Sequence, residues 1–343
     1  MSKKVTIETV AKLADVSISS VSRVINGSAR VSREKQKRIE AALNQLGYRS
    51  QLIANEKHKS KLQCIGVLLQ DLTSNYYTNA ILGIEHALRK SGFYPVFISG
   101  HWDSGTEQEA IEVLLERHMA GILVIGGHLP DGHLRTLARQ LPTVILDRHV
   151  KGLEKQCLTM NNVLGGYLAT QHLIRLGHQH IAHITGDLRT LDARDRLQGY
   201  RQALLEADLP FNPNLVVEGN FNEPTGLMAM ELLFSRGRNF TSVFVSNDQM
   251  ALGVRLALFR RGIRVPEDVS LVGFDDIRGV DYMSPPLTTI KHPIYEMVQA
   301  AINHLIEMLG STQPRQMPRF DPSLVVREST RMLFTQTRND TTH

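Results

Sequence analysis

The first fifty residues carry apolar side chains at the spacing of short helices. Two helices are expected on either side of Asp15 and Val16, and a third is expected to begin near Ser32 and to end at Gly47. Their apolar positions are Ile7, Val10, Ala11 and Ala14 in the first, Val21, Val24 and Ile25 in the second, and Ile39, Ala42, Leu43 and Leu46 in the third. Helices this short are not stable alone, so the three must bury these faces against one another.

The break between the first two helices indicates a helix-turn-helix motif. Ser17 can cap the second helix, because its hydroxyl can accept a hydrogen bond from an amide two or three residues further on. In this motif the second helix enters the major groove of DNA with its N-terminal residues on the base edges. The pattern therefore predicts a small DNA-binding unit at the start of the chain.

After a polar and basic linker over residues 48–60, short apolar runs alternate with helical patterns. Strands are expected over 64–69, 94–98, 121–125, 143–146, 180–184, 215–217, 242–245, 269–272, 287–290 and 324–327, and helices over 76–91, 105–118, 131–140, 163–176, 193–207, 224–236, 248–261 and 294–309. This alternation predicts parallel sheets covered by helices on both faces, in two doubly wound subdomains. The strand 287–290 and the helix 294–309 mark where the chain is expected to return to the first subdomain.

Polar and aromatic residues gather where the expected strands end. Open parallel sheets bind ligands beyond the carboxyl ends of their strands. The segments at those ends are residues 70–77, 99–102, 147–148, 186–196, 219–221, 246–248 and 273–276, which are rich in Asn, Asp, Arg and aromatic residues. Flat rings can cover the apolar faces of a ligand and fixed polar groups can bond its hydroxyls, so the mixture suits a polyhydroxylated or heterocyclic ligand.

The charge of the chain is unevenly placed. Residues 1–60 hold twelve Lys and Arg against five Asp and Glu, a local net charge of +7, whereas the whole chain has a net charge of +5. The composition, 42% hydrophobic and 21% charged, is otherwise that of an ordinary globular protein, and 343 residues suffice for two or three domains. A basic head on a nearly neutral body is typical of a nucleic-acid-binding protein.

The cysteines and the hydropathy of the chain indicate in which cellular compartment the protein is expected. Cys64 and Cys157 lie in or beside apolar stretches and form no CxxC pair, so they are expected to be buried free thiols in a reducing compartment. No apolar run is long enough to span a bilayer, and the N-terminus has no hydrophobic core of a secretory signal. The sequence therefore predicts a cytoplasmic protein.

An ordered set of motifs resembles the lactose/galactose repressor (LacI/GalR) family, and most closely its galactose-repressor branch. The motifs are Thr6-Ile-Glu-Thr-Val-Ala with Val21-Ser-Arg-Val-Ile-Asn26, Leu173-Ile-Arg-Leu-Gly-His178, Arg196-Leu-Gln-Gly-Tyr200, Asn247-Asp-Gln-Met-Ala-Leu-Gly253, Val265-Pro-Glu-Asp-Val-Ser-Leu-Val-Gly-Phe-Asp-Asp276 and Pro286-Leu-Thr-Thr-Ile290. The resemblance covers about residues 5–330. It implies a helix-turn-helix headpiece, a hinge and a core of two subdomains like that of periplasmic binding proteins, connected by three crossings.

Together with the strand and helix pattern, the resemblance predicts the domain boundaries. The α-helical headpiece is expected over 1–49 and the hinge over 50–61. The α/β core is expected to have an N-subdomain made of 62–161 with 291–320 and a C-subdomain made of 162–290 with 321–331, followed by a polar tail over 332–343. The family dimerises through its core, and no leucine heptads follow Met332, so a dimer without a C-terminal tetramer bundle is expected.

The resemblance also implies which residues contact a near-palindromic operator. Ile18, Ser19 and Arg23 should face the groove, where a guanidinium can bond both O6 and N7 of guanine and an isoleucine can contact a thymine methyl. Phosphate contacts, which carry no base information, are expected from Ser17, Ser20, Ser22 and Asn26. Further DNA contacts are expected from Thr6, Arg30, Ser32 and Lys57.

The hinge departs from the family pattern. Ser50 stands where the family has proline, and Lys57 stands where it has a leucine that wedges into the minor groove. A lysine is not easily buried between base pairs. We therefore expect Lys57 to contact phosphate, and the operator to be bent less or by another route.

Effector contacts are carried over from the family in the same way. Arg196, Asn247 and Asp275 match its polar ligand contacts, and Phe221 matches the ring that packs on the ligand. Candidates from the first subdomain are Asp71, Tyr76, Tyr77, Trp102 and Asp147. Another departure is Met160-Asn161-Asn162, where the family commonly has an aspartate. The resemblance implies a small sugar as effector, and a nucleoside or purine is the alternative.

No catalytic motif accompanies these features. The sequence has no Walker loop, GxSxG, HExxH or GxGxxG pattern, and His178, His180 and His183 lack partners at metal-binding spacing. We expect no enzyme activity, cofactor or metal. The rival hypotheses are a cytoplasmic sugar-binding protein without operator specificity and a sugar-modifying enzyme. The prediction is a transcriptional repressor of sugar-utilisation genes, which its effector releases from DNA through a reciprocal coupling of the two binding sites.

Overall fold

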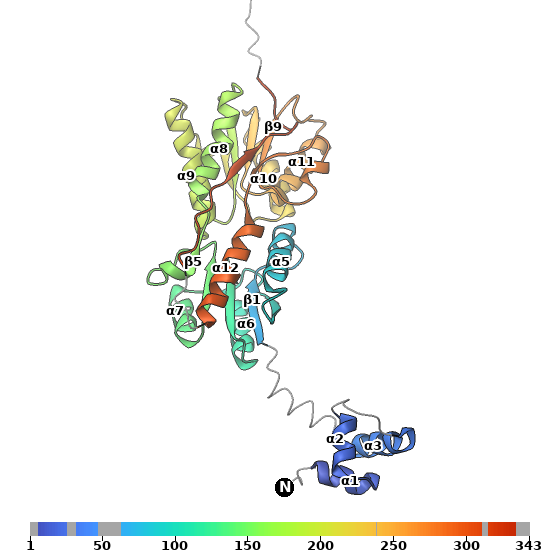
Figure 1. The fold of residues 1–343 in the computed structure, drawn as a ribbon. Coiled ribbons are helices and arrows are strands. Elements are labelled where there is room, and N and C mark those ends of the chain that lie inside the picture. The colour runs from blue at the N-terminus through green and yellow to red at the C-terminus, as the bar shows by residue number, and fades with distance from the viewer. Residues whose placement is uncertain (1–5, 26–31, 47–62, 238, 311–314, 334–343) are drawn as a thin grey trace, which may run out of the picture. The chain divides into compact units, whose positions relative to one another are not determined.

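The computed structural model describes residues 6–25, 32–46, 63–237, 239–310 and 315–333 (Figure 1). The chain forms two compact units, residues 1–62 and residues 63–343. No helix among the described residues is long and apolar enough to cross a membrane.

The described part of the first unit consists of three helices. They are α1 (Ile7–Ala14), α2 (Ile18–Ile25) and α3 (Arg33–Gln45). Their shared core contains the predicted residues Val10, Ala11, Ala14, Val21, Ile39, Ala42 and Leu43. The chain leaves α1 through Asp15 at a φ of 48°, a left-handed conformation that aspartate tolerates, and Ser17 Oγ accepts from the Ser20 amide at 3.3 Å. The predicted helix-turn-helix and its serine cap are confirmed, whereas Gly47 lies outside the described residues.

The second unit begins with a parallel sheet of five strands in the order β2-β1-β3-β4-β5. The strands are β1 (Gln63–Leu69), β2 (Phe93–Ser99), β3 (Gly121–Ile125), β4 (Thr143–Leu146) and β5 (Cys157–Leu158). Leu123 and Ile125 face α5 (Asn75–Leu88) and α12 (Ile294–Leu309). Ile122 and Val124 face the opposite layer, which holds α6 (Ser104–Glu116) and α7 (Asp131–Gln140). The alternation of side chains along β3 therefore separates two helical layers.

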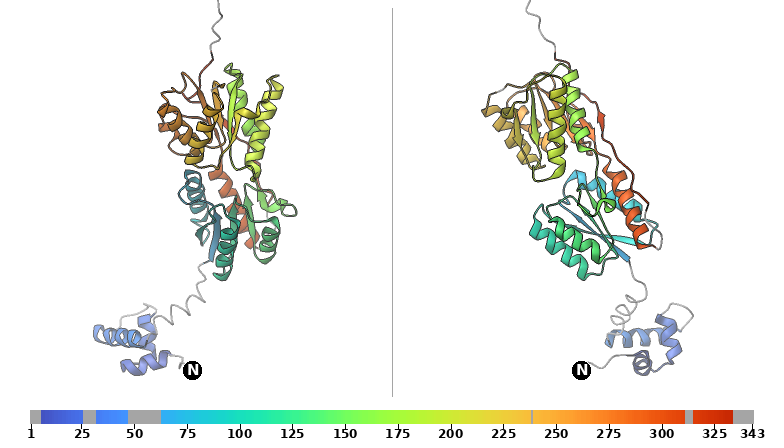
Figure 2. Two further views of the ribbon diagram at one scale, coloured as in Figure 1. Left: turned by 180° about the vertical axis from the view of Figure 1, so that it is seen from behind. Right: turned by 90° about the vertical axis from the view of Figure 1, so that its left-hand side faces the viewer.

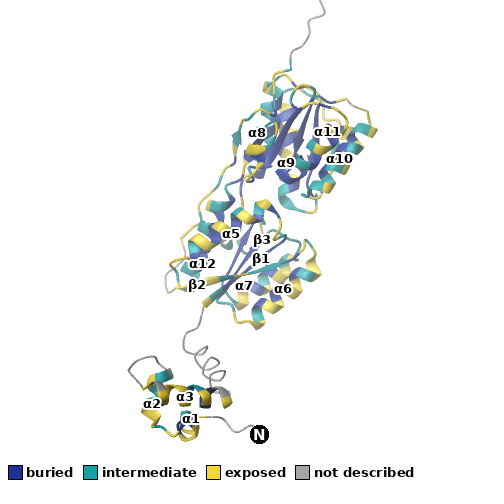
Figure 3. Ribbon diagram, turned by 90° about the vertical axis from the view of Figure 1, so that its right-hand side faces the viewer, coloured by how far each residue is buried: buried dark blue, intermediate teal, exposed yellow. Residues whose placement is uncertain are grey.

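A second sheet has six strands in the order β11-β10-β9-β8-β6-β7. They are β6 (Ile181–Thr185), β7 (Val216–Glu218), β8 (Ser242–Val245), β9 (Ser270–Asp275), β10 (Thr288–Lys291) and the antiparallel edge strand β11 (Ser323–Val325). One face packs on α8 (Asn162–Arg175) and α9 (Leu191–Glu206), and the other on α10 (Glu223–Ser235) and α11 (Asp248–Arg260). Figure 2 shows both sheets between their helical layers, and Figure 3 shows the central strands β1 and β3 as largely buried.

Glycines allow the helix pairs of this sheet to pack closely. A Cβ added to Gly199 on α9 would lie 2.0 Å from the Val163 carbonyl of α8. A Cβ added to Gly253 on α11 would lie 1.9 Å from the Glu223 carbonyl of α10. Because a side chain at either position would have to push the partner helix away, both glycines set the helix spacing.

The two subdomains of the second unit are linked by segments that run side by side. Met160, between β5 and α8, forms an isolated parallel bridge with Phe320, which precedes β11. The Asn161 amide donates to the Phe320 carbonyl at 3.4 Å. The third connection is the short segment between β10 and α12 that contains His292. β10 pairs with β9 in the second sheet, whereas α12 packs on the first, so the chain returns to the first subdomain at this segment.

Most predicted elements are present within about two residues of their expected bounds, and the differences have local causes. The strand expected over 269–272 continues to Asp275, because its last residues pair with β10. The two-residue strand β5 and the short turns at 154–156, 213–215 and 280–282 were not predicted, since they are shorter than any hydrophobic period. Cys64 and Cys157 are free, but both are half-buried rather than buried as expected.

Candidate ligand cleft and nucleic-acid interface

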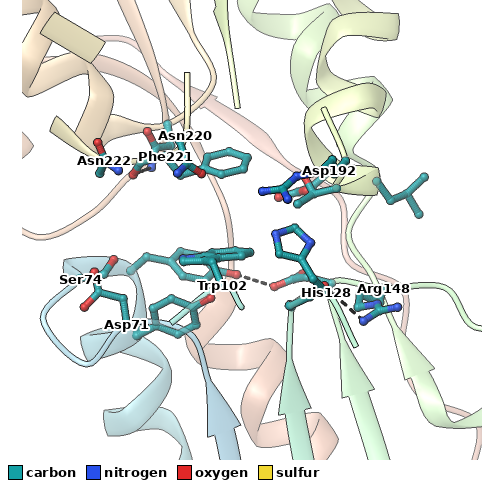
Figure 4. Close-up of a pocket in the computed structure, with 18 of the residues that line it drawn as sticks. Asp71, Ser74, Trp102, His128, Arg148, Asp192, Asn220, Phe221 and Asn222 are labelled. Atoms are coloured by element: carbon teal, nitrogen blue, oxygen red, sulfur yellow. Dashed lines mark hydrogen bonds between the residues drawn. The ribbon is translucent and has the colours of Figure 1, made fainter. Parts of the chain in front are cut away.

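A cleft of about 810 Å³ opens between the two subdomains of the second unit, at the carboxyl ends of their strands (Figure 4). Residues from both subdomains line it, with six aspartates and four arginines among them. All nine residues predicted to contact an effector lie on this one cleft: Asp71, Tyr76, Tyr77, Trp102, Asp147, Arg196, Phe221, Asn247 and Asp275. Their convergence follows from the parallel topology, which brings the ends of distant strands to one edge.

Four of these residues have a left-handed backbone. The φ angles are 56° at Trp102, 58° at Asp147, 59° at Phe221 and 109° at Asp275. Each residue ends a strand or follows one within three positions, at β2, β4, β7 and β9 respectively. Residues other than glycine adopt such angles at an energetic cost, and they cluster at binding sites where the surrounding structure holds them. The strained backbone turns these four side chains into the cleft.

Two aromatic rings face each other from opposite subdomains. The rings of Trp102 and Phe221 are stacked, with centroids 6.1 Å apart (Figure 4). The Trp102 amide donates to Gln70 Oε1 at 3.1 Å, and the Phe221 carbonyl accepts from Asn247 Nδ2 at 2.8 Å. Hydrogen bonds to buried side chains therefore fix the backbone under both rings.

Arg196 is buried and held on several sides. Its Nε donates to Asn162 Oδ1 at 2.9 Å, and its guanidinium carbon lies 3.7 Å from the centroid of the Phe274 ring. Its Nη atoms lie 3.8 Å from carboxylate oxygens of Asp192 and Asp275. Asn162 is one of the residues where the family commonly has an aspartate, and here its oxygen orients the arginine.

Asn247 has a structural role that sequence reasoning missed. Its Oδ1 accepts from the Met250 amide at 2.9 Å and caps α11, while its Nδ2 holds the Phe221 carbonyl. One N–H and one lone pair of the side chain remain for other partners. Asn247 therefore positions Phe221 in addition to lining the cleft.

Four ionisable groups meet at one end of the cleft: Tyr76, Asp147, His292 and Asp275. Tyr76 Oη donates to Asp147 Oδ2 at 2.6 Å, and His292 lies between Asp147 and Asp275. Burial raises the pKa of the Asp147 carboxyl and raises the pKa of Asp275 to about 7. Burial also raises the pKa of the Tyr76 and Tyr77 hydroxyls well above the ordinary value, so both remain protonated donors. His292 was not predicted as a site residue.

Other residues missed from the sequence connect the subdomains across the cleft. Ser74 Oγ donates to Gln249 Oε1 at 2.5 Å, and His128 Nε2 lies 3.5 Å from Asp187 Oδ2. The buried Glu107 carboxylate accepts from the amides of His128 and Leu129 at 2.8–2.9 Å and so holds this loop. For His128, the sequence feature that could have indicated a site residue is the run Gly126-Gly-His128, which directly follows a predicted strand.

Two of the three histidines considered for metal binding have other partners. His178 bonds to Thr241 Oγ1 at 2.8 Å and Ser270 Oγ at 3.0 Å. His183 is stacked between Phe244 and Tyr200, with ring centroids 4.5 and 4.9 Å away. Both histidines therefore pack into the second subdomain.

In the first unit, α2 presents the predicted reading residues to solvent. Ile18 is 48% exposed, and Ser19 and Arg23 are exposed, whereas Val21 is buried. Ser17 also bonds to the hydroxyls of Ser19 and Ser20, both at 2.9 Å, and Ser22 is half-buried.

The other expected DNA contacts lie around this helix or outside the described residues. Thr6 caps α1 by accepting from the Thr9 amide, and the exposed Ser32 directly precedes α3. Asn26, Arg30 and Lys57 lie outside the described residues. An exposed isoleucine and an exposed arginine on one short helix suit contact with base edges.

Comparison with known proteins covers both units. A model of the lacI family of bacterial regulatory proteins matches residues 6–51, and a model of the periplasmic binding protein-like domain matches residues 170–330. The HTH-type transcriptional regulator GalR of Salmonella typhimurium is 35% identical over 326 residues, covering 94% of this chain and 95% of GalR. The ribose operon repressor of Escherichia coli is 35% identical over 329 residues, covering 94% of this chain and 99% of that repressor.

A solved structure is similar over nearly the whole chain. The lac repressor dimer bound to operator and the anti-inducer ONPF has a TM-score of 0.74 at 28% identity, covering 96% of this chain and 100% of that one. Its fold therefore contains both units described above.

Proposed function

The chain belongs to the lacI family of bacterial regulatory proteins, and on this basis we propose that it represses genes of sugar utilisation under the control of a small sugar bound in the cleft. It is a DNA-binding transcriptional regulator and not an enzyme. As a regulator of bacterial genes, it is proposed to act in the cytoplasm, with operator DNA and a second copy of itself as partners.

The hydrogen-bonding state of the cleft carries the sugar assignment. Arg148 bonds to Asp131 and the Gly127 carbonyl, Arg189 bonds to Asp187, and Arg194 bonds to two backbone carbonyls, so each is already engaged, as Arg196 is. Six aspartates line the same cleft, and an ionised carboxylate can only accept hydrogen bonds. The cleft lining thus holds acceptors, while its four arginines are already bonded. This arrangement favours an uncharged ligand with many hydroxyl donors.

The stacked rings of Trp102 and Phe221 suit a sugar, and they also suit the alternative ligand, a purine. A sugar ring presents C–H groups that can lie against Trp102 or Phe221 while its hydroxyls reach the aspartates. A flat purine could instead enter between the two rings, which are already nearly parallel. A nucleoside or purine is therefore the second candidate.

The operator is proposed to be read by α2 in a symmetric dimer. Two helix-turn-helix units in one dimer bind two half-sites, so the operator is expected to be nearly palindromic. For the dimer, the second subdomain has large apolar side chains that are exposed: Met228 is 67% exposed, Phe259 is 69% exposed and Tyr282 is 85% exposed. We propose that such side chains are covered by a second copy.

Control is proposed to work by linkage between the two sites. A ligand that binds one arrangement of the subdomains more tightly changes the equilibrium between arrangements, and operator affinity changes by the coupling free energy. We favour a ligand that releases the operator. By reciprocity, operator DNA must then weaken sugar binding by the same factor.

A thermal-shift screen tests the assignment. The full chain is heated with galactose, ribose, cellobiose, hypoxanthine and guanosine at millimolar concentration, since a ligand specific to the native state raises the unfolding temperature. A shift of the unfolding temperature with a sugar, and none with hypoxanthine or guanosine, supports the proposal. A shift with hypoxanthine or guanosine alone overturns it in favour of the second candidate. An operator selected from random DNA with the same protein, and released by the active ligand, separates a repressor from a sugar-binding protein without operator specificity.

A further inference from the structure

His292 occupies a buried position between the two subdomains. It lies in the segment that leaves β10 and enters α12, and its side chain is only 2% exposed. Its Nε2 is 3.6 Å from Asp147 Oδ1 in the first subdomain, and its Nδ1 is 3.7 Å from Asp275 Oδ1 in the second. The His292 amide also donates to the Asp275 carbonyl at 3.2 Å. The imidazole thus stands between two carboxylates that both line the cleft.

This cluster has unsatisfied hydrogen-bonding capacity. Both ring nitrogens of His292 and the facing Oδ1 atoms of Asp147 and Asp275 lack hydrogen-bond partners among the described residues. A neutral imidazole carries one N–H and can donate to one carboxylate only, whereas an imidazolium carries two and can donate to both. Shortening the two gaps by a few tenths of an ångström would satisfy all four atoms at once, provided that His292 is protonated.

Several other ionisable groups face His292. The Tyr76 ring lies 5.3 Å from the His292 ring and donates to Asp147, while Arg196 and Asp192 act on it from α9. Burial lowers the pKa of His292 to about 4 and raises that of Asp275 to about 7. In the arrangement seen here, His292 is therefore neutral near neutral pH. Asp275 carries a proton below about pH 7 and loses it to solvent above that pH.

We propose that His292 is a positioning residue of the effector site, which holds Asp147 and Asp275 as acceptors for ligand hydroxyls and takes up a proton when they are engaged. This inference rests on the proposed sugar-binding function. A ligand hydroxyl that donates to Asp275 favours its ionised form, so the proton moves to His292 Nδ1. The imidazolium then donates from Nδ1 to Asp275 and from Nε2 to Asp147. Below pH 7 the proton comes from Asp275, and above pH 7 it comes from solvent.

The proton balance gives a measurable signature. Binding should take up almost no proton at pH 6.0 and about one proton per site at pH 8.0. Sugar affinity should therefore fall with rising pH above about 7, approaching about tenfold per pH unit. A histidine with a purely structural role would affect stability or affinity at every pH, and its substitution would not change how steeply sugar affinity falls with pH.

The experiment compares the full-length protein with His292→Gln, which keeps hydrogen-bonding groups but cannot titrate. Calorimetric titrations with galactose, ribose and cellobiose are made at pH 6.0 and 8.0 in HEPES and in Tris, whose different ionisation enthalpies reveal proton uptake. We expect uptake at pH 8.0 in the wild type and none in His292→Gln. His304→Gln is the matched control, since His304 is a buried histidine on α12 that bonds to the Arg315 carbonyl, and it should behave as the wild type. Unchanged uptake in His292→Gln overturns the inference.

A ligand-free measurement separates this inference from the sugar assignment. In ¹³C-labelled protein, the carboxyl resonance of Asp275, identified by its loss in Asp275→Asn, should titrate near pH 7, and its midpoint should move in His292→Gln. If none of the three sugars binds, the sugar assignment fails, while this titration still tests the cluster. A resonance that does not titrate between pH 6 and 8, or that is unchanged in His292→Gln, overturns the positioning role.

Discussion

The indole ring of Trp102 and the phenyl ring of Phe221 lie across the cleft from each other, with their planes inclined by only 21° and their centroids 6.1 Å apart. One ring belongs to each subdomain, and each rests on a backbone that is left-handed and hydrogen-bonded to a buried side chain. The separation of the two rings therefore depends on the relative angle of the subdomains. Any ligand that changes this angle must alter the environment of both rings.

Trp102 is the single tryptophan of the chain, so intrinsic fluorescence should report occupation of the cleft. We expect Trp102→Ala to weaken sugar binding by about 10- to 100-fold through loss of buried apolar contact. Affinity is measured by calorimetry for this variant and by fluorescence for the wild type. Trp102→Phe is the control, which should lose the signal and keep most of the affinity. Equal affinities for the alanine variant and the wild type would contradict the assignment.

Arg196 should be important for the stability of the second subdomain. Arg196→Met leaves Asp275 buried beside no cation and Asn162 Oδ1 without its donor. We expect the free energy of unfolding, measured with urea, to fall by about 3 kcal/mol or more. Arg194→Met removes an exposed arginine from the same helix and should change it by less than about 1 kcal/mol. Similar losses in both variants would show that burial of Arg196 is not the cause.

Stability should also fall in acid because of His183. Its ring is fully buried between Phe244 and Tyr200, and burial lowers its pKa to about 4. The folded pKa is thus below the ordinary value of about 6.5, so the stabilisation is fully present above pH 6.5 and is lost as pH falls towards 4. The loss should be about 3 kcal/mol. Urea unfolding at several pH values should show a smaller acid dependence in His183→Phe, and identical slopes would refute the prediction.

Arg23 should contribute to base recognition. Arg23→Ala is expected to weaken binding to the selected operator by about 1–3 kcal/mol and to relax preference at one base pair of each half-site. Lys12→Ala, at an exposed position on α1, should affect specific and non-specific DNA alike. Mobility-shift titrations on the operator and on single-base variants provide the measurement. Uniform weakening by Arg23→Ala would indicate a phosphate contact instead.

Lys57 should reduce the bending of the operator relative to a protein with a leucine wedge. Lys57→Leu is expected to increase the bend, because an apolar side chain can enter between base pairs in the minor groove. Gel phasing with the selected operator measures the angle. An unchanged bend in the variant would show that this position does not set it.

Sequence reasoning located the cleft well because its residues follow predictable strands. Trp102, Asp147 and Phe221 each come just after a run of strand-like residues, and parallel topology brings such positions together. Their left-handed backbone could not be predicted, since nothing in a tryptophan or a phenylalanine favours a positive φ. It is enforced by contacts formed only after folding.

The burial and the contacts of His292 and Glu107 could not be predicted from the sequence. His292 faces two carboxylates only because β10 and α12 belong to different subdomains, which a local pattern does not reveal. Glu107 looks like a solvent-facing residue of an amphipathic helix, yet it is fully buried and bonds to a loop about twenty residues away. Charged residues are rarely buried, so the local pattern favoured exposure.

The return of the chain to the first subdomain through α12 has a consequence during synthesis. The sheet of β1 to β5 leaves the ribosome well before α12, whose residues Ile294, Met297, Val298 and Ala301 complete the core on one side of that sheet. The apolar face of the first sheet that packs on α12 therefore remains exposed while nearly all of the second subdomain is translated. The core formed by α1, α2 and α3 differs, because all of its residues lie near the start of the chain and are translated together. The first subdomain thus completes its core only after residue 309 has emerged, and the nascent chain is a candidate for chaperone binding until then.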